Sequence, residues 1–260
     1  MNMSSGQLYR PRTRSSGVRQ GAAREGPISD TLLKSDIAHL RAQGRGIQLL
    51  DGLSRQDQDA ILAAGSYRRF FHGSVVTYQG EPADSLFLLT KGSARYFFIT
   101  PQGQQVYLLW LAPGEIFGVA SLMEERADFL VCTEVVENSR VLVWKRSRIR
   151  DLVARYPRLL ENALGITSDY LTWYLASHLS LVCHTARERL AHVLVSLASG
   201  IGKKSSHGIK LDVTNEQLAN TANITLFTAS RLLSGWQRSG AVAKRRGQVL
   251  LLHPKRLFHP

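Results

Sequence analysis

The chain has 260 residues, a formal net charge of +13 at pH 7, and a composition that is 44% hydrophobic and 20% charged, which is typical of a soluble globular protein. Its length is sufficient for two domains that each bury a core. No stretch approaches the ~20 consecutive apolar residues of a membrane span, and the N-terminus has no apolar core of a signal peptide. We therefore expect a cytoplasmic protein without a membrane partner.

The positive charge is unevenly distributed along the chain. Residues 1–46 contain 8 basic and 3 acidic residues, residues 47–184 contain 13 and 14, and residues 185–260 contain 12 and 3. A nearly neutral middle followed by a strongly basic last third favours a C-terminal module that binds a polyanion, for which nucleic acid is the natural candidate.

The N-terminal region is basic and has little hydrophobic patterning. Residues 1–46 are rich in Arg, Ser and Gly and show no apolar periodicity before Leu32–Leu40, so we expect a mostly disordered extension with room for a short helix at its end. Ser54 is a typical N-cap, with Asp57 three residues later, and it predicts a short helix through Ala64.

Residues 47–156 have the pattern of an all-β domain. Short β-rich runs alternate with glycines, a spacing that favours an antiparallel sandwich or barrel over a parallel sheet. The predicted strands are Val75–Tyr78, Leu86–Leu89, Ala94–Phe98, Val106–Leu111, Leu130–Thr133 and Val141–Trp144.

Residues 157–184 predict one long helix with an apolar seam. The seam follows a 4–3 alternation, which a helix can bury against a symmetry mate, although Thr167 and His178 interrupt it. Packing against the helix's own β-domain is the alternative, and both contacts can coexist on different faces. The proposed dimer positions are Leu160, Leu164, Leu171, Tyr174, His178 and Leu181.

The basic region 185–260 begins with a further helix. Thr185-Ala-Arg-Glu188 matches a capping box, and the apolar spacing of Leu190, Val193, Leu194 and Leu197 continues the helix. The stretch from Gly200 to Gly208 is polar and predicts a loop.

The strongest functional pattern lies between Thr214 and Leu252. Thr214-Asn-Glu-Gln217 is a second capping box, a three-residue turn follows the short helix, and Thr225 caps another helix. In that helix one stripe is apolar and buried, and the opposite stripe, which contains Phe227 and Arg231, is mostly polar. Two short helices with a tight turn suit the major groove of DNA.

A basic hairpin follows the second helix and resembles a wing. The strands Ala241–Lys244 and Gln248–Leu252 flank Arg245-Arg246-Gly247. Arg231 can hydrogen-bond to the edge of a guanine base, and Thr225 and Ser230 can contact phosphates or bases. Phe227 can contact a thymine methyl group or pack inward. The alternative to DNA binding is a packed α+β subdomain that binds no ligand. The candidate DNA-binding residues are Thr214, Thr225, Leu226, Phe227, Ser230, Arg231, Ser234, Lys244, Arg245 and Arg246.

Together these motifs resemble the Crp–Fnr family of cyclic-AMP receptor and fumarate–nitrate reduction regulators over residues 48–255. The resemblance implies an α+β protein with a jelly-roll β-domain of the cyclic-nucleotide type, a parallel dimer through the long helix, and a winged helix-turn-helix that reads a near-palindromic site. For an activator it also implies contact with RNA polymerase. It rests on Gly73–Phe87, Lys91–Ala94, Gly114–Gly118, Pro157, Thr214–Ala219 and Thr225–Leu233.

The ligand positions of the resemblance depart from the family pattern. Cyclic-nucleotide-binding members use a Gly-Glu pair and a following Arg-Ser/Thr pair, because a buried phosphodiester needs a guanidinium and hydroxyl donors. Here Val119 stands at the Glu position and Phe129-Leu130 at the Arg-Ser/Thr position, so we expect no usual binding of cyclic AMP. The pocket-equivalent positions are Gly118, Val119, Phe129, Leu130, Tyr174 and Leu175.

No cofactor is expected. The iron–sulfur branch of the family uses several N-terminal cysteines, whereas residues 1–131 contain none. Cys132 and Cys183 are far apart without CxxC or Cys/His ligand spacing, which indicates a reduced compartment and no metal site. A haem-gated regulator remains an alternative, with His72, Met123, Cys132 and His178 as candidate axial ligands.

The competing functional classes are less well supported. We find no P-loop, GxSxG, HExxH or paired carboxylates in a cleft arrangement, so we expect no enzyme and no catalytic residues. A ligand-binding adaptor without transcriptional output is opposed by the helix-turn-helix. A regulator without any effector, in which Val119, Phe129, Leu130 and Leu175 complete a core, and one with an unidentified ligand both remain open.

Overall fold

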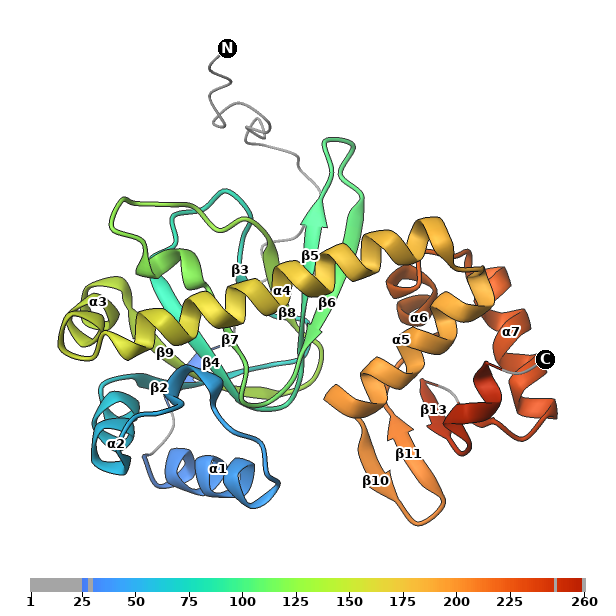
Figure 1. Cartoon of the computed structure of the whole chain (residues 1–260), viewed down its shortest axis with the longest axis horizontal. Coiled ribbons are helices and arrows are strands. Elements are labelled where there is room, and N and C mark those ends of the chain that lie inside the picture. The colour runs from blue at the N-terminus through green and yellow to red at the C-terminus, as the bar shows by residue number, and fades with distance from the viewer. Residues whose placement is uncertain (1–24, 28–29, 246, 259–260) are drawn as a thin grey trace. The chain divides into compact units, whose positions relative to one another are not determined.

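The computed structural model describes residues 25–27, 30–245 and 247–258 (Figure 1). The chain forms two compact units, one of residues up to Val106 together with Pro113–Leu164, and one of Tyr107–Ala112 together with Gly165–Pro260. No helix within these described ranges is long and apolar enough to cross a membrane.

The first unit is a β-roll of two antiparallel sheets, as the sequence predicts. One sheet has the strand order β1-β2-β9-β4-β7 and the other β3-β8-β5-β6. The strands are β1 Glu25–Pro27, β2 Ser66–Phe70, β3 Val75–Thr77, β4 Ser85–Lys91, β5 Ala94–Ile99, β6 Gln105–Leu111, β7 Ile116–Phe117, β8 Cys132–Val135 and β9 Ser139–Lys145.

This unit also contains helices α2 and α3, and the sequence predicted the start of α2. Helix α2, Arg55–Ala63, begins after Ser54, whose Oγ accepts a hydrogen bond of 3.2 Å from the backbone N–H of Asp57. Helix α3, Arg146–Arg155, follows β9 directly and buries Ile149 and Leu152. The Ser54 cap therefore confirms the predicted helix start.

The sequence prediction missed strands β1, β2 and β7 and placed β8 two residues too early. Strand β2 was not predicted, because Arg68 and Arg69 interrupt its apolar alternation, yet the strand pairs with β9 over its full length. Strand β8 was predicted at Leu130–Thr133 and instead spans Cys132–Val135. Before β8 begins, the backbone of Phe129 exchanges hydrogen bonds with Gly80 and Glu81, outside the ladders that β8 forms with β3 and β5.

Helix α1, Asp30–Ala42, packs on the β-roll through one apolar face. Leu33, Ile37 and Leu40 follow helical spacing and are buried, with exposed fractions of 1–7%. The extension predicted for residues 1–46 thus contains an ordered helix at its end, and the disorder predicted for residues 1–24 lies outside the described residues.

A buried polar network ties α1 to the sheet. Asp36 forms an ion pair with Arg140, with Nη2 2.6 Å from Oδ1, and its other carboxylate oxygen accepts a hydrogen bond from the hydroxyl of Tyr67. Thr90 Oγ1 lies 2.9 Å from that hydroxyl and donates to the carbonyl of Arg140. Burial, followed by the bond to the Asp36 carboxylate, raises the pKa of Tyr67. The network anchors α1 in one orientation on β2, β4 and β9.

The second unit contains helices and a small antiparallel sheet around one apolar core. Its sheet has the order β10-β11-β13-β12. The core includes Leu190, Leu194, Leu218, Leu233 and Trp236. The elements are the main part of α4 Arg158–Cys183, then α5 Ala186–Gly200, β10 Lys203–Ser205, β11 Gly208–Leu211, α6 Asn215–Thr221, α7 Leu226–Arg238, β12 Val242–Arg245 and β13 Gln248–Leu251.

The predicted polar loop between Gly200 and Gly208 is a hairpin instead. Lys203–Ser205 pairs with Gly208–Lys210, so the polar stretch supplies an exposed edge strand. Gly208 has φ +154°, and a Cβ there would lie 2.3 Å from the carbonyl oxygen of Leu251. Glycine is therefore required by the close approach of β11 to the end of β13, a contact that local sequence does not reveal.

We predict that Asp36→Ala lowers the free energy of unfolding of the first unit by about 3 kcal/mol, because it leaves the Arg140 charge without its partner and Tyr67 without its acceptor. The measurement is urea unfolding of the full chain, with hydrogen exchange assigning the loss to peptides of β2 and β9. The control is Asp59→Ala, which breaks an exposed pair with Arg55 and should change the same quantity by less than about 0.5 kcal/mol. Equal effects of both variants would contradict the assigned role of the network.

Candidate functional site

Helices α6 and α7 form the predicted helix-turn-helix. Thr214 closes a complete capping box with Gln217, and Thr225 Oγ1 accepts a hydrogen bond of 3.1 Å from the backbone N–H of Thr228. Between the helices, Asn223 adopts a left-handed conformation with φ +49°. Both threonine hydroxyls thus serve as helix caps, and each also lies at the exposed start of its helix.

Helix α7 has one buried face and one exposed face. Ala229, Leu233 and Trp236 are buried at 0–1% exposure, as the apolar stripe predicts. On the other side Phe227 is 76% exposed and Arg231 is exposed, and the start of the helix exposes 53% of Leu226. Ser230 and Ser234 are partly exposed. The predicted positions of α7 therefore lie together at its surface.

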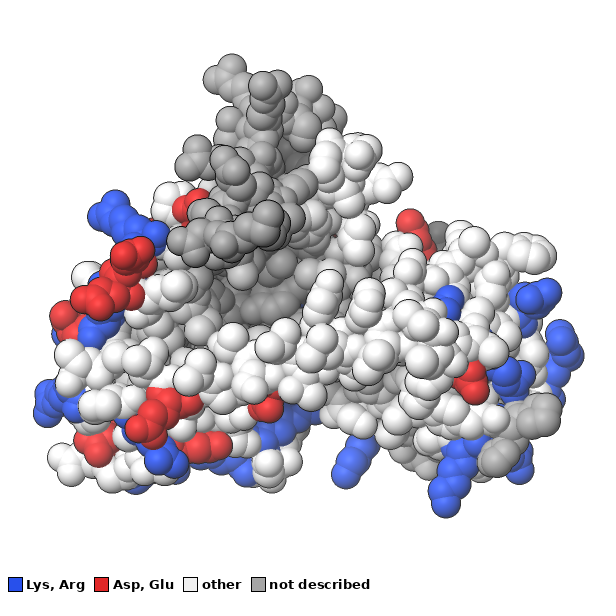
Figure 2. Space-filling model, turned by 45° about the horizontal axis from the view of Figure 1, so that its top comes forward, with Lys and Arg blue, Asp and Glu red and all other residues white. Residues whose placement is uncertain are grey.

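The predicted wing is the hairpin of β12 and β13. Gly247 at its tip has φ +71°, and Arg245 is exposed, whereas Arg246 lies outside the described residues. Lys244 Nζ lies 3.5 Å from Ser234 Oγ, which joins the wing to α7. Figure 2 shows Lys and Arg side chains over the second unit with few acidic side chains among them, in line with its 12 basic and 3 acidic residues from 185 onward.

Sequence reasoning missed one residue that holds the turn between α6 and α7. Arg189 on α5 donates hydrogen bonds to the carbonyls of Ala222 and Asn223, at 3.1 and 3.3 Å, and to the carbonyl of His184 at 3.1 Å. The guanidinium thereby ties the start of α5 to the turn that sets the angle of α7. The capping box Thr185-Ala-Arg-Glu188, which the structure confirms, was the available signal, because it places Arg189 in the first turn of α5.

In the first unit, two of the pocket-equivalent positions, Gly118 and Phe129, lie at an aromatic cluster. The rings of Phe87 and Phe117 stack with centroids 4.7 Å apart, and the ring of Phe129 lies 6.4 Å from Phe87. Gly118 has φ +83°, and a Cβ there would lie 2.6 Å from the carbonyl of Ser85. Val119 starts a short 3-10 helix and is half-buried. The residues in this part of the unit supply no guanidinium or hydroxyl pair at the predicted phosphate position.

The interpretation in which four apolar positions complete a core needs correction. Phe129 is buried at 8% exposure, but Leu130 is 81% and Leu175 is 53% exposed. The backbone bonds of Phe129 to Gly80 and Glu81 turn its side chain inward, and the adjacent Leu130 consequently turns outward. Tyr174, 55% exposed, also lies on the surface of α4.

The candidate haem ligands differ in environment. Cys132 is fully buried, and its Sγ accepts a hydrogen bond from the backbone N–H of Gln79. Burial raises the pKa of this thiol, which disfavours the thiolate that iron would need. His72, Met123 and His178 are exposed. Among the described residues, no group of three or more His, Cys, Asp or Glu is arranged to hold a metal ion.

The long helix α4 exposes its predicted seam. At the start of the helix the other face is packed within the first unit, where Leu159 and Ala163 are buried and Asn162 donates to the carbonyl of Leu49 at 2.9 Å. Both contacts that the sequence left open can therefore coexist. The exposed fractions of the apolar seam residues are 49% for Leu160, 70% for Leu164, 58% for Leu171, 55% for Tyr174 and 42% for Leu181, and His178 is exposed as well.

Two family models match the sequence in the order that the structure shows. The cyclic nucleotide-binding domain matches residues 67–156, and the Crp-like helix-turn-helix domain matches residues 188–259. The cyclic AMP receptor protein of Thermus thermophilus is 27% identical over 205 residues, which cover 79% of this chain and 92% of the relative. The transcriptional activator protein FnrA of Stutzerimonas stutzeri is 24% identical over 212 residues, covering 80% and 85%.

Solved structures with the same fold are also known. FixK2 from Bradyrhizobium japonicum gives a TM-score of 0.65 at 19% identity and covers 74% of this chain and 95% of its own. The c-di-GMP responsive global regulator CLP of Xanthomonas campestris gives 0.65 at 20% identity, covering 76% and 99%. These likenesses confirm the predicted fold of a cyclic-nucleotide-type β-domain followed by a helix-turn-helix.

We predict that Arg189→Leu loosens the turn between α6 and α7, because three carbonyls lose a charged donor. Amide hydrogen exchange at residues 222–228, measured by mass spectrometry, should accelerate at least about tenfold, which corresponds to about 1.4 kcal/mol. Arg189→Lys should recover little, since an ammonium cannot span three separated acceptors. Lys204→Leu, at an exposed position of β10, is the control. Unchanged exchange in Arg189→Leu would show that the turn holds without this residue.

Proposed function

Because the chain belongs to the Crp–Fnr family of transcription regulators, we propose that it acts in the cytoplasm as a homodimer that binds a near-palindromic operator in double-stranded DNA. Its relatives are regulators and not enzymes, which confirms the prediction that the chain is not an enzyme. The observation that carries the proposal is the exposed face of α7, with Arg231 on it, in a strongly basic unit.

In the proposed complex the residues of this unit divide into base-reading and phosphate-binding groups. Arg231 offers two parallel donors to the O6 and N7 acceptors of guanine, while Ser230 and Ser234 lie beside it for shorter polar contacts. Thr214 and Thr225, at the helix starts, face the phosphates that approach helix N-termini. Lys244, Arg245 and Arg246 on the wing bind phosphates, which strengthens binding without sequence choice.

The start of α7 is unusually apolar for a surface that faces a DNA groove, and this determines which base we expect at one position of each operator half-site. Phe227 and Leu226 are large, exposed and adjacent to the N-cap, where a recognition helix meets base edges. An aromatic ring cannot accept a hydrogen bond from the N4 amino group of cytosine, but it can contact the thymine methyl group. We therefore propose that each half-site has thymine at this position.

The homodimer is proposed through α4. The helix exposes a continuous run of apolar side chains that the chain itself leaves uncovered, and such surfaces are typical of protein interfaces. A parallel pair of α4 helices would bury Leu164, Leu171 and Tyr174 against their counterparts. Two-fold symmetry in the protein then requires two-fold symmetry in the operator.

Cyclic AMP and an iron–sulfur cluster are not proposed as effectors. A buried cyclic phosphate would meet Val119 and the aromatic ring of Phe129, and neither can compensate its charge. The chain's two cysteines lie in β8 and at the end of α4, which is no ligand set for a cluster. The alternative proposal is a regulator whose DNA binding is controlled by haem or by an unidentified small molecule. If the protein is an activator, it would also contact RNA polymerase.

We predict that the purified full chain, without added ligand and at near-physiological salt, selects a two-fold symmetric motif from random duplex DNA, with half-sites about 10 base pairs apart. Arg231→Ala should weaken operator binding by about 5- to 150-fold and relax selection at one base pair per half-site. Arg245→Ala, by contrast, should weaken binding to all DNA sequences equally. It should also reduce the steepness of the plot of log affinity against log salt concentration by about one, the contribution of one phosphate contact. Selection of no motif, or wild-type affinity in Arg231→Ala, would contradict the proposal.

We predict that replacing the critical thymine by deoxyuridine, which lacks only the methyl group, weakens operator binding by about fourfold, because one methyl contact contributes about 0.8 kcal/mol. In Phe227→Ala the same replacement should have no effect, and Leu226→Ala serves as the matched variant beside it. The measurement is a titration of each protein with both duplexes. An equal deoxyuridine effect in wild type and Phe227→Ala would show that Phe227 reads no methyl group.

A further inference from the structure

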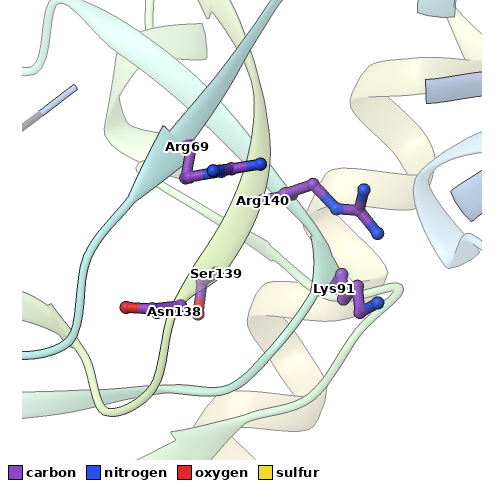
Figure 3. A pocket seen from close by; sticks show the side chains of 5 residues that line it. All are labelled: Arg69, Lys91, Asn138, Ser139 and Arg140. Carbon is purple, nitrogen blue, oxygen red and sulfur yellow. The ribbon is translucent and has the colours of Figure 1, made fainter. Parts of the chain in front are cut away.

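Three cationic residues lie side by side across three strands of the first unit. Arg69 on β2 is the direct cross-strand partner of Arg140 on β9, and Arg140 is in turn the register partner of Lys91 on β4. Figure 3 shows the three side chains extending to the same side, with Arg140 between Arg69 and Lys91. Like charges opposite one another in neighbouring strands destabilise a sheet, so this row needs a physical explanation.

The described carboxylates near these three cationic residues do not neutralise their positive charge. Arg140 is paired with Asp36, and its side chain is only 16% exposed. Within the described part of the chain, the side chains of Arg69 and Lys91 have no hydrogen-bond or ion-pair partner, and both residues are exposed. Among the described residues, the three positive charges therefore share the one negative charge of Asp36, which leaves an excess of two.

The same residues line a hollow of about 220 Å³, together with Asn138 and Ser139, and none of the described residues that line it is acidic. Asn138 Oδ1 accepts a hydrogen bond from the backbone N–H of His72, so the amide NH₂ group remains as a further donor. The Ser139 hydroxyl is turned to the carbonyls of Glu137 and Ser93 and belongs to the wall. The hollow thus offers donors from three cations and an amide.

We propose that this hollow is a binding site for a small molecule that carries a phosphate group. Guanidinium groups match phosphate oxygens with two parallel bonds, and the Lys91 ammonium supplies a further point charge. Only one nitrogen of Arg140 is committed to Asp36, which leaves its other donors for the ligand. Arg140 is recessed, so a group must enter the hollow to reach it, which favours a small ligand over the outer surface of duplex DNA.

The site is separate from the helix-turn-helix and from the aromatic cluster around Phe129, and it does not depend on the proposed function. A ligand there would contact Arg140 and, through its pair with Asp36, stabilise helix α1 on the sheet. The cations would then be retained for binding, at the expense of stability in the unliganded protein.

The experiment is calorimetric titration of the full chain with pyrophosphate and with adenosine and guanosine 5′-monophosphates, at constant ionic strength set by chloride. We expect pyrophosphate to bind, Arg69→Gln and Lys91→Gln each to weaken binding about tenfold, and the double variant to abolish it. Tighter binding of a monophosphate nucleotide than of pyrophosphate would assign the ligand to the nucleotide class. Lys34→Gln, which removes an exposed charge of α1 outside the lining, is the charge-matched control and should bind as wild type.

Thermal unfolding without any phosphate compound supplies a second readout. The double variant Arg69→Gln/Lys91→Gln should unfold at a temperature no lower than wild type, because the like-charge repulsion is removed. Absence of pyrophosphate binding, or equal binding by wild type and the double variant, would overturn the proposal. A loss of operator affinity in the double variant without phosphate compounds would also overturn it, since the cations would then bind DNA.

Discussion

Helix α7 has one face that the unit must bury, and this constraint determines what the protein can present to DNA. Ala229, Leu233 and Trp236 enter a core shared with α5, α6 and the small sheet, and Trp236 is among the largest fully buried side chains. Because the helix repeats every ~3.6 residues, burial of these three positions sets the rotation of the helix. Phe227 and Arg231 are consequently exposed.

The position of α7 along its axis and its angle depend on separate polar contacts. The Thr225 cap determines where the helix begins, and Arg189 holds the carbonyls of the turn that precedes it. Apolar burial is not directional enough to set either quantity, whereas hydrogen bonds to particular carbonyls are. The exposed face of α7 thus depends on Arg189, a residue of α5 that lies outside that face.

The first unit combines a family fold with an aromatic cluster in its interior. Gly118 has a left-handed conformation and a close backbone approach, and the rings of Phe87, Phe117 and Phe129 lie beside it. A fold therefore does not specify a ligand; the side chains at the site do. In the same unit, the outward row of Arg69, Arg140 and Lys91 concentrates charge where the pairing of strands, and not the local sequence, brings the three together.

Features that depend on neighbouring residues could be predicted from the amino-acid sequence. The caps at Ser54, Thr185, Thr214 and Thr225, the two faces of α7 and most strands of the β-roll follow from local hydrogen bonding and periodicity. Contacts between residues at distant positions became visible only in the folded chain. The pair of Asp36 with Arg140, the reach of Arg189 to Asn223 and the strand β2 all require partners 34 to 104 positions away or a neighbouring strand. These contacts depend on the packing of distant segments and on the pairing of strands, which local sequence patterns do not specify. The sequence could therefore indicate the class of protein but not these long-range contacts.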